Sequence, residues 1–447
     1  MCALALRPNA AQHSSIARPN KLTHTDNTPT MQRPPINLAP SPRVPHTTLH
    51  TCANGTRLYT LHNSKQGVIR VSFIFRAGTS WQSVPFSASA TINTLSEGTE
   101  QFSALEIAER LDFVGSYFDA NIDRDWAVLT YCSLSKFARE TFEIAEQVVL
   151  HPTFPEREIG VYCTKRKEQL IVQRSKPDHL SRELFGKSIF GADHPYGVTS
   201  PAEAYDALTR EDIEHFYRTH YTAENCFAVL CGDITEEHIA HTKAILEQLP
   251  HGSLDQRTIP TPISTPRAEL KVEGAVQSCL KIGRTLFPRT HPDFVPMQVV
   301  STALGGYFGS RLMQNLRERH GYTYGAYAAM INLDRSGYFV MSADVASEYT
   351  SAATKEMLKE VESFCSEPMR DRELQMVKNI IFGDVMRIFD GPFGVADVTI
   401  ENIQNGTDNG YTERFLQQVA SITAEQLQEV ATKYLQKDLL TITTVGE

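Results

Sequence analysis

Few residues in this chain have the type and spacing that catalysis or metal binding requires. The nearest approach to a metal site is the pair His238 and His241 in the run EHIAH, because histidines three apart share one face of a helix. The pair has no third ligand at a suitable spacing and lies among charged residues, so we interpret it as a solvated helix face. His215 and His220 lie beside an apolar helical stripe, and we interpret them as structural. The helical zinc motifs H-x-x-E-H and H-E-x-x-H do not occur in the sequence.

The eight cysteines do not indicate a zinc or redox site. None forms a C-x-x-C pair, and Cys226 and Cys231 flank the apolar run FAVL, which is typical of a buried strand. We therefore expect reduced thiols and a cytoplasmic protein.

The densest group of candidate residues is the run LGGYFGSRLMQNLRERHGYTYGAYA at positions 304–328. Its first glycines, Gly305 and Gly306, are not followed by Gly-Lys-Ser/Thr, so the run is not a phosphate-binding loop of that type. Close helix packing, or the approach of a substrate backbone, explains them better. Taken alone, Arg317 would be a surface arginine in the last turn of a helix, and Tyr324 would be a strand tyrosine.

The composition is that of an ordinary soluble protein. The chain has 447 residues, of which 41% are hydrophobic and 21% charged, and this length fits two large domains or about three smaller ones. A net charge of -9 argues against a nucleic-acid partner bound through a basic surface. No apolar run is long enough to span a bilayer, so we also expect no membrane partner.

Residues 1–47 form a leader of different composition. The first fifty residues hold eight of the 23 prolines, five Lys or Arg residues and one acidic residue, Asp26. This segment is compatible with a transit peptide, but we favour a disordered leader or a start site at Met31.

The remainder of the chain repeats itself. Thr209 and Thr423 each precede an amphipathic helical run with an N-terminal capping signal. Each run leads to a β-rich segment that ends in glycine followed by an acid, at Gly232 and at Gly446. The members of both pairs are 214 residues apart, which indicates a duplication.

The Pro-rich run IPTPISTP divides the repeated part and predicts a linker at 251–267. We therefore predict an α+β fold of two homologous domains, 48–250 and 268–447, with mixed strands and long helices. Early in the first domain, Asn54-Gly55 predicts a hairpin and Val68–Arg76 a strand.

The run at 304–328 closely resembles the C-terminal motif of the pitrilysin/insulinase family of zinc metallopeptidases, in its processing-peptidase-like branch. The shared features are Gly-Gly, a Ser-Arg-Leu helix, then Leu-Arg and, after a glycine, a tyrosine. HPYG at 194–197 is a weaker match. The resemblance extends over residues 48–447 and implies two domains that close like a clamshell around a peptide.

In that family, zinc is held by an H-x-x-E-H helix in the first domain and by a glutamate about 75 residues further on. Here Ser89 and Asn93 stand at the histidine positions, and Ile92 stands at the position of the general base. The distal ligand falls on Gln169, or on Glu168 if the alignment shifts by one residue. Hydroxyl and amide oxygens are poor zinc ligands beside imidazole and carboxylate. The resemblance therefore implies that this chain holds no catalytic zinc.

The second half of the family's site is retained. Arg317 and Tyr324 match the arginine and tyrosine, seven residues apart, with which the family's second domain holds the substrate carbonyl. By this resemblance, Tyr324 would donate a hydrogen bond to the developing oxyanion, and Arg317 would bind a backbone carbonyl. Gly305 and Gly306 would lie against the substrate backbone.

One half-site is thus absent while the other is intact. We predict a non-metal-binding subunit of a heteromeric zinc metallopeptidase, inactive alone and active as a heterodimer with a homologous zinc-bearing subunit that acts on an unfolded peptide. The alternative is a non-catalytic structural or peptide-binding protein with a peptidase fold. Ile92 and Asn93 contradict a peptidase that is active alone.

Overall fold

The structure, a computed structural model, describes residues 45–63, 66–253, 258–389 and 391–447. Residues Ser41–Glu447 form one compact unit. Most of the predicted leader, including Met31, lies outside the described residues, as do positions 254–257 of the predicted linker. The interpretations of those segments stay predictions.

The first sheet consists of β1 (Thr48–Thr51), β2 (Arg57–His62), β3 (Val68–Phe75), β4 (Tyr117–Ile122), β5 (Ala127–Leu134) and β6 (Cys226–Gly232). Their order across the sheet is β1-β2-β6-β3-β5-β4. β2 and β6 run parallel, and the other neighbours are antiparallel. The predicted hairpin joins β1 to β2, and Gly55 in its turn has a φ of 86°, which favours glycine.

The second sheet consists of β7 (Arg267–Lys271), β8 (Gln277–Leu286), β9 (Ala326–Leu333), β10 (Ser336–Ala346) and β11 (Thr441–Gly446). Its order, β7-β11-β8-β10-β9, repeats the order β2-β6-β3-β5-β4 of the first sheet strand for strand. The single parallel pair, β7 with β11, also corresponds to β2 with β6. This confirms the predicted α+β fold of two matching halves.

The helices of the first half are α1 (Ser87–Thr94), α2 (Ala104–Phe113), α3 (Ala138–Leu150), α4 (Glu156–Arg174), α5 (Pro177–Phe190), α6 (Ala204–Ala207), α7 (Arg210–His220) and α8 (Glu236–Glu247). Those of the second half are α9 (Phe294–Gly305), a π-helix (Met313–Arg319), α10 (Thr350–Ser366), α11 (Asp371–Ile388), α12 (Pro392–Gln404), α13 (Tyr411–Ser421) and α14 (Ala424–Tyr434). Short 3-10 helices lie at Thr79–Trp81, Ser135–Phe137, Ala223–Asn225, Ser347–Tyr349 and Lys437–Leu439. Reciprocal capping boxes open α7 at Thr209 and α14 at Thr423, as the sequence predicts.

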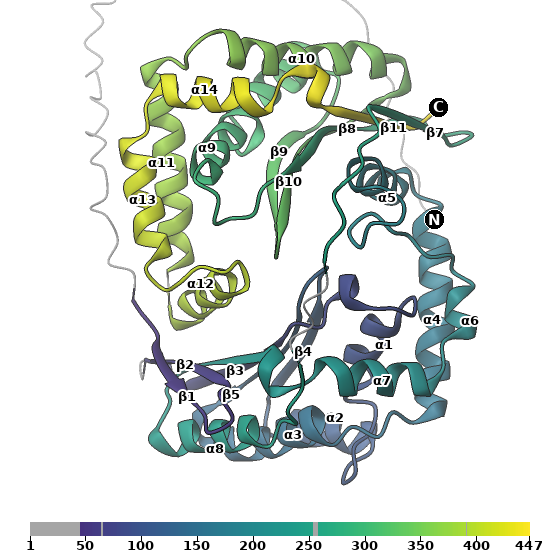
Figure 1. Cartoon of the computed structure of the whole chain (residues 1–447), viewed down its shortest axis with the longest axis vertical. Helices are drawn as coiled ribbons and strands as arrows, with labels where there is room; N and C mark the ends of the chain where they lie inside the picture. Colours follow the sequence, from purple (N-terminus) through teal and green to yellow (C-terminus); the bar gives the residue numbers. More distant parts are fainter. Residues whose placement is uncertain (1–44, 64–65, 254–257, 390) are drawn as a thin grey trace, which may run out of the picture. The chain divides into compact units, whose positions relative to one another are not determined.

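Each sheet is covered on one face by helices of its own half and on the other face by a helix of the opposite half. α12 packs on the first sheet through the buried Ala396, and α5 packs on the second sheet through Phe185. Figure 1 shows α5 next to β11 and α12 next to β2. An ion pair of 2.6 Å joins Arg70 of β3 to Asp397 of α12. The predicted domain bounds stay a prediction, and the two halves exchange one helix each because both faces of each sheet are apolar.

A buried carboxylate also joins two turns from opposite halves. Asp125, between β4 and β5, accepts hydrogen bonds from the hydroxyls of Ser80 (3.1 Å) and Tyr196 (2.7 Å). Its second oxygen accepts the backbone N–H of Asp334, between β9 and β10 (2.9 Å). Tyr196 of the HPYG run also packs in one apolar cluster with Leu333 and Val340 of the second half, so that run contributes to the contact between the halves.

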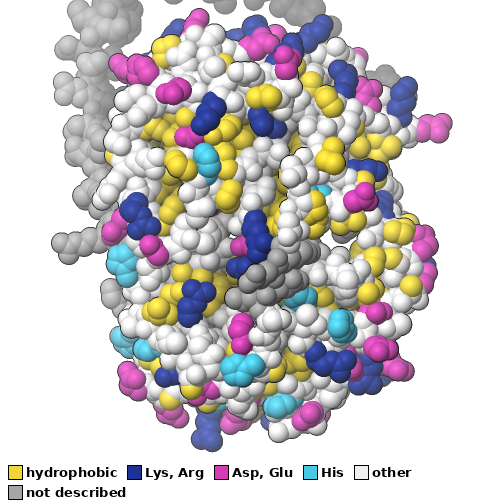
Figure 2. Space-filling model, in the orientation of Figure 1, with side chains coloured by type: hydrophobic (Ala, Val, Ile, Leu, Met, Phe, Trp, Pro, Cys, Tyr) yellow, Lys and Arg dark blue, Asp and Glu magenta, His cyan; other side chains and the backbone are white. Residues whose placement is uncertain are grey.

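Among the described residues, no helix combines the length and apolarity needed to cross a membrane. On the face shown in Figure 2, acidic and basic side chains are interspersed and do not gather by sign. The absence of a nucleic-acid partner stays a prediction.

Candidate functional site

The aligned metal-site positions of α1 are engaged within their own helix. The Ser89 hydroxyl donates to the carbonyl of Phe86 (3.0 Å), and the Asn93 side-chain amide donates to the carbonyl of Ser89 (2.7 Å). Ile92 is fully buried in the core of the first half. The Ser89 hydroxyl and the Asn93 amide are thus bonded to the helix backbone, and Ile92 is buried in the core.

The predicted distal position does not face Ser89. Gln169 is exposed on α4, where its side-chain oxygen accepts from Arg166 (3.3 Å), and Glu168 is also exposed. One residue further along, Leu170 lines the same cavity as Ser89. The structure therefore brings an apolar side chain, and not Gln169, towards the former metal position.

Two phenols complete the surroundings of Ser89, namely Tyr162 of α4 and Tyr205 of α6. Burial raises the pKa of both, that of Tyr205 to about 12, so both stay protonated at neutral pH. Among the described residues, no three His, Cys, Asp or Glu side chains lie close enough to hold a metal ion. Hydroxyls, an amide and a leucine do not fit a zinc ion, which is compatible with the predicted lack of zinc on this chain.

The cavity at this position has a volume of about 350 Å³. It lies among α1, α4 and α5 and is lined by cationic, hydroxyl and apolar side chains. Phe86 on its wall has a φ of 67°, which is rare for a bulky residue, and its ring stacks on Tyr205 at 3.9 Å. Sequence reasoning identified Ser89 but missed Phe86 and the cationic residues of this cavity, because they belong to no motif.

Arg317 lies in the π-helix Met313–Arg319, a rare helix type that is frequent at functional sites. Its guanidinium lies over the ring of Phe308 at 4.6 Å, and the side chain is 37% exposed. Asn315 of the same helix donates to Glu356 of α10 (3.0 Å). Arg317 is therefore held at the surface by a helix that α10 anchors.

Tyr324 lies at the apex of a braced turn before β9, and not in the strand. The Thr323 hydroxyl donates to the carbonyl of Gly325 (2.8 Å) and accepts from its N–H (3.1 Å). The N–H of Ala326 donates to the sulfur of Met313 (3.3 Å), which ties the start of β9 to the π-helix. Tyr324 is 91% exposed, and its hydroxyl bonds to no residue that the structure describes. Its backbone is thus fixed while its side chain points outward.

Gly305 and Gly306 lie at the end of α9, close to this motif in the chain. A Cβ atom on Gly305 would lie 2.1 Å from the backbone nitrogen of Ala328 in β9. Gly305 is buried and allows α9 to pack closely on β9, whereas Gly306 is exposed. The geometry assigns Gly305 a packing role, and substrate contact by either glycine stays a prediction.

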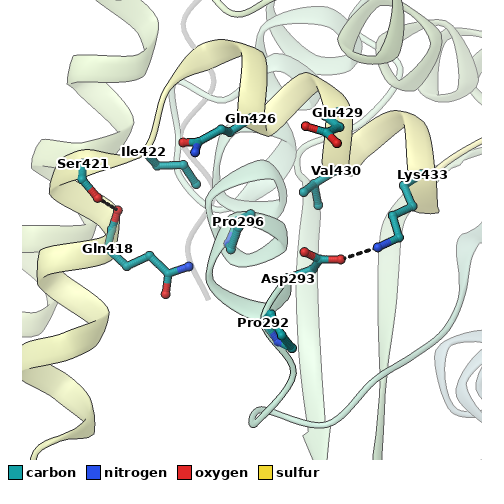
Figure 3. Close-up of a pocket in the computed structure, with 10 residues that line it drawn as sticks. All are labelled: Pro292, Asp293, Pro296, Gln418, Ser421, Ile422, Gln426, Glu429, Val430 and Lys433. Atoms are coloured by element: carbon teal, nitrogen blue, oxygen red, sulfur yellow. Dashed lines mark hydrogen bonds and ion pairs between the residues drawn. The ribbon is translucent and has the colours of Figure 1, made fainter.

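The pocket drawn in Figure 3 lies between α14 and the start of α9, where Lys433 pairs with Asp293 (2.7 Å). Four positions of α14 line it, and the same four positions of α7, 214 residues earlier, line a cavity of about 380 Å³ in the first half. These positions hold Asp212, His215, Phe216 and Thr219 in α7, and Gln426, Glu429, Val430 and Lys433 in α14. Because the shape repeats while the chemistry differs, we attribute both cavities to the repeated fold.

His238 and His241 are half-buried, so their interpretation as a solvated face is wrong. Their rings lie edge-on to Phe142 of α3, at 6.0 and 5.4 Å, and His238 completes the capping box of α8 with Thr235. Burial lowers the pKa of His238. The two histidines are partly buried because a phenylalanine on another helix packs against them, and the sequence of α8 alone does not show that contact.

Comparison with known proteins finds similarity to a family of peptidases. Residues 207–381 match the family described as peptidase M16 inactive domain. An uncharacterized zinc protease of Bacillus subtilis is 19% identical over 345 residues, covering 75% of this chain and 83% of that protein. An uncharacterized zinc protease of Mycobacterium leprae is 23% identical, covering 77% of this chain and 78% of that protein.

Two solved structures share the fold over most of the chain. A peptidase M16 inactive domain from Pseudomonas fluorescens superposes with a TM-score of 0.82 at 23% identity, covering 90% of this chain and 98% of that one. A protease from Helicobacter pylori gives 0.81 at 19% identity, covering 90% and 99%. Over residues 207–381 the chain is therefore similar to the M16, or pitrilysin-like, peptidases, it shares their fold over most of its length, and it lacks the H-x-x-E-H motif.

Proposed function

We propose that this chain is the non-metal-binding subunit of a heteromeric zinc metallopeptidase, and that it presents Arg317 and Tyr324 to a peptide at the zinc site of a homologous partner. The observation that carries the proposal is the state of Tyr324. A tyrosine that only stabilises a fold buries its ring or bonds its hydroxyl, whereas this one is 91% exposed on a braced turn. Such a positioned donor is suited to an acceptor outside the chain.

The chemistry of the pair fits the stabilisation of a substrate carbonyl. A phenol donates one hydrogen bond to an oxygen that gains negative charge, and a guanidinium adds a fixed positive charge beside it. Phe308 holds the Arg317 guanidinium at 4.6 Å, so less conformational freedom is lost when it binds. Neither residue activates water, which is why the proposal needs a partner with a metal and a base.

An extended peptide fits the elements next to the pair. β9 begins two residues after Tyr324 and lies at the edge of the second sheet, where it pairs only with β10 among the described strands. The backbone N–H and C=O groups along such an edge can pair with an added strand. This supports an unfolded segment, and not a folded protein surface, as the substrate.

The test is to purify the chain alone and after co-expression with a homologue from the same organism that carries H-x-x-E-H. We expect no stoichiometric zinc and no cleavage of an unfolded reporter peptide by the chain alone. We expect one zinc per heterodimer and clear cleavage by the complex. Stoichiometric zinc in the isolated chain would contradict the proposal. A stable complex without cleavage would favour the structural or peptide-binding alternative.

A further inference from the structure

The cavity at the former metal position carries the opposite charge preference to a metal site. Besides Ser89 and Leu170, its lining includes Arg124, Arg174 and Arg182 against a single acid, Glu183. A zinc site gathers carboxylates and imidazoles around a cation, whereas this lining has a positive balance. The charge of the cavity therefore excludes a cation as its natural ligand and favours an anion.

The three arginines are not equally available. Arg174 is held by Glu183 through two hydrogen bonds to one oxygen (3.0 and 2.7 Å) and by the carbonyl of Ser200 (2.8 Å). Arg182 pairs with Asp178 at the surface, where its side chain is 64% exposed and the pair is weak. Arg124, in the turn between β4 and β5, makes no ion pair with a residue that the structure describes. Arg124 is thus the free cation of the site, and Arg182 is the second one that can turn inward.

The remaining titratable group in the lining is His179 of α5. Its ring nitrogen lies 3.3 Å from Glu183, which already binds Arg174. The Glu183 carboxylate is therefore already engaged by Arg174 and His179. Arg124 therefore has no available acid among the lining residues, although its charge attracts Asp123 in its own turn.

The walls of the cavity suit the last residue of a peptide. Phe86, Leu170 and Val198 supply apolar surface, while the hydroxyl of Thr199 supplies a donor. The volume of about 350 Å³ is at the lower end of the usual range of ligand pockets, about 300–1,000 Å³. A carboxylate that carries one apolar side chain would use both kinds of wall.

We propose that this cavity binds a peptide carboxylate, with Arg124 as its principal ligand and Arg182 as a second one. The site belongs to this chain alone and requires neither the partner subunit nor the Arg317–Tyr324 pair. It goes beyond the proposed function, because it gives the emptied metal site a binding role of its own.

The test is calorimetric titration of the full chain with three short peptides of the same sequence ending in leucine. One has a free C-terminus, one is amidated, and one is amidated with an internal aspartate. We expect the free acid to bind at least about 10-fold more tightly than the amide, because a hydrogen bond to a charged group is lost on amidation. If the aspartate peptide binds as tightly as the free acid, the carboxylate chemistry stands and an acidic side chain is the source.

Arg124→Gln should weaken binding of the free acid about 10-fold, and higher salt should weaken it further. The matched control is Arg139→Gln on α3, a side chain that is 78% exposed and lies outside the cavity, which should leave binding unchanged. Equal binding of acid and amide, or an unchanged affinity in Arg124→Gln, would overturn the proposal. So would saturable binding of zinc chloride that Arg124→Gln alters. Because the chain is tested alone, these outcomes are independent of peptidase activity.

Discussion

Replacing Gly305 by alanine separates the two roles that the sequence left open for this glycine. An alanine Cβ would lie 2.1 Å from the nitrogen of Ala328 and 2.6 Å from the carbonyl carbon of Tyr327, both in the β9 backbone. Ordinary contact requires about 3.5 Å or more, so α9 and β9 would have to separate by roughly 1.4 Å. Overpacking of this kind costs about 1–3 kcal/mol, and a strand backbone yields less readily than a side chain.

The same change also reduces the backbone freedom of the unfolded chain, and in a helix this effect raises the free energy of unfolding by about 0.5–1 kcal/mol for alanine relative to glycine. The net expectation for Gly305→Ala is therefore a loss of roughly 1–2 kcal/mol in the free energy of unfolding. Gly383→Ala in α11 is the matched control, because its Cβ would meet nothing within 4 Å. That variant should be stabilised by about 0.5–1 kcal/mol, so the two identical substitutions should have opposite signs.

Urea-induced unfolding of both variants, followed by circular dichroism, gives the comparison. A shift of the two midpoints in opposite directions supports close packing of α9 on β9. If Gly305→Ala is stabilised as much as Gly383→Ala, the packing argument is refuted, and the substrate backbone becomes the better explanation for this glycine.

Three further predictions concern buried polar groups. Asp125→Ala should cost about 3 kcal/mol or more, because it removes the acceptor of three buried hydrogen bonds, from the hydroxyls of Ser80 and Tyr196 and from the Asp334 N–H, while Tyr196→Phe should cost about 1 kcal/mol; equal losses in urea unfolding would contradict this. Burial raises the pKa of Asp334, so the folded state holds its proton more tightly than the unfolded state, and this stabilisation is present near pH 4 and lost as the pH rises. The wild type should gain stability relative to Asp334→Asn between pH 7 and pH 4, and a difference that does not vary with pH would count against this assignment. Burial raises the pKa of the Cys231 and Cys279 thiols to about 12. Both thiols should therefore react with a thiol reagent at pH 8 at least about 10-fold more slowly in the native chain than in the urea-unfolded chain. Labelling followed by mass spectrometry measures the two rates.

Local patterns in the sequence predicted the elements and their repetition. The threonine caps of α7 and α14 and the glycine of the first hairpin are local signals, because each residue bonds or turns within its own segment. The two sheets follow, since alternating runs and the 214-residue offset describe the same strands twice.

Contacts between distant segments could not be predicted in the same way. The apolar face of α5 or α12 does not specify which sheet it covers, and the helices cover the opposite sheet. Asp125 is a single acid in a turn, with no period to mark it. The predicted distal ligand shows how much an alignment shift of one residue matters. Neighbouring residues on a helix point about 100° apart, so Gln169 is exposed while Leu170 lines the cavity.

The central claim is that this chain contributes Tyr324 to a reaction whose metal it does not hold. The most direct measurement is kcat for peptide cleavage by the assembled heterodimer with Tyr324→Phe, at unchanged zinc content and unchanged assembly. Loss of a donor to a developing oxyanion predicts a fall of about 10²–10³. Tyr349→Phe, a partly exposed tyrosine outside the turn, should leave kcat unchanged. An unaltered kcat in Tyr324→Phe would contradict the account.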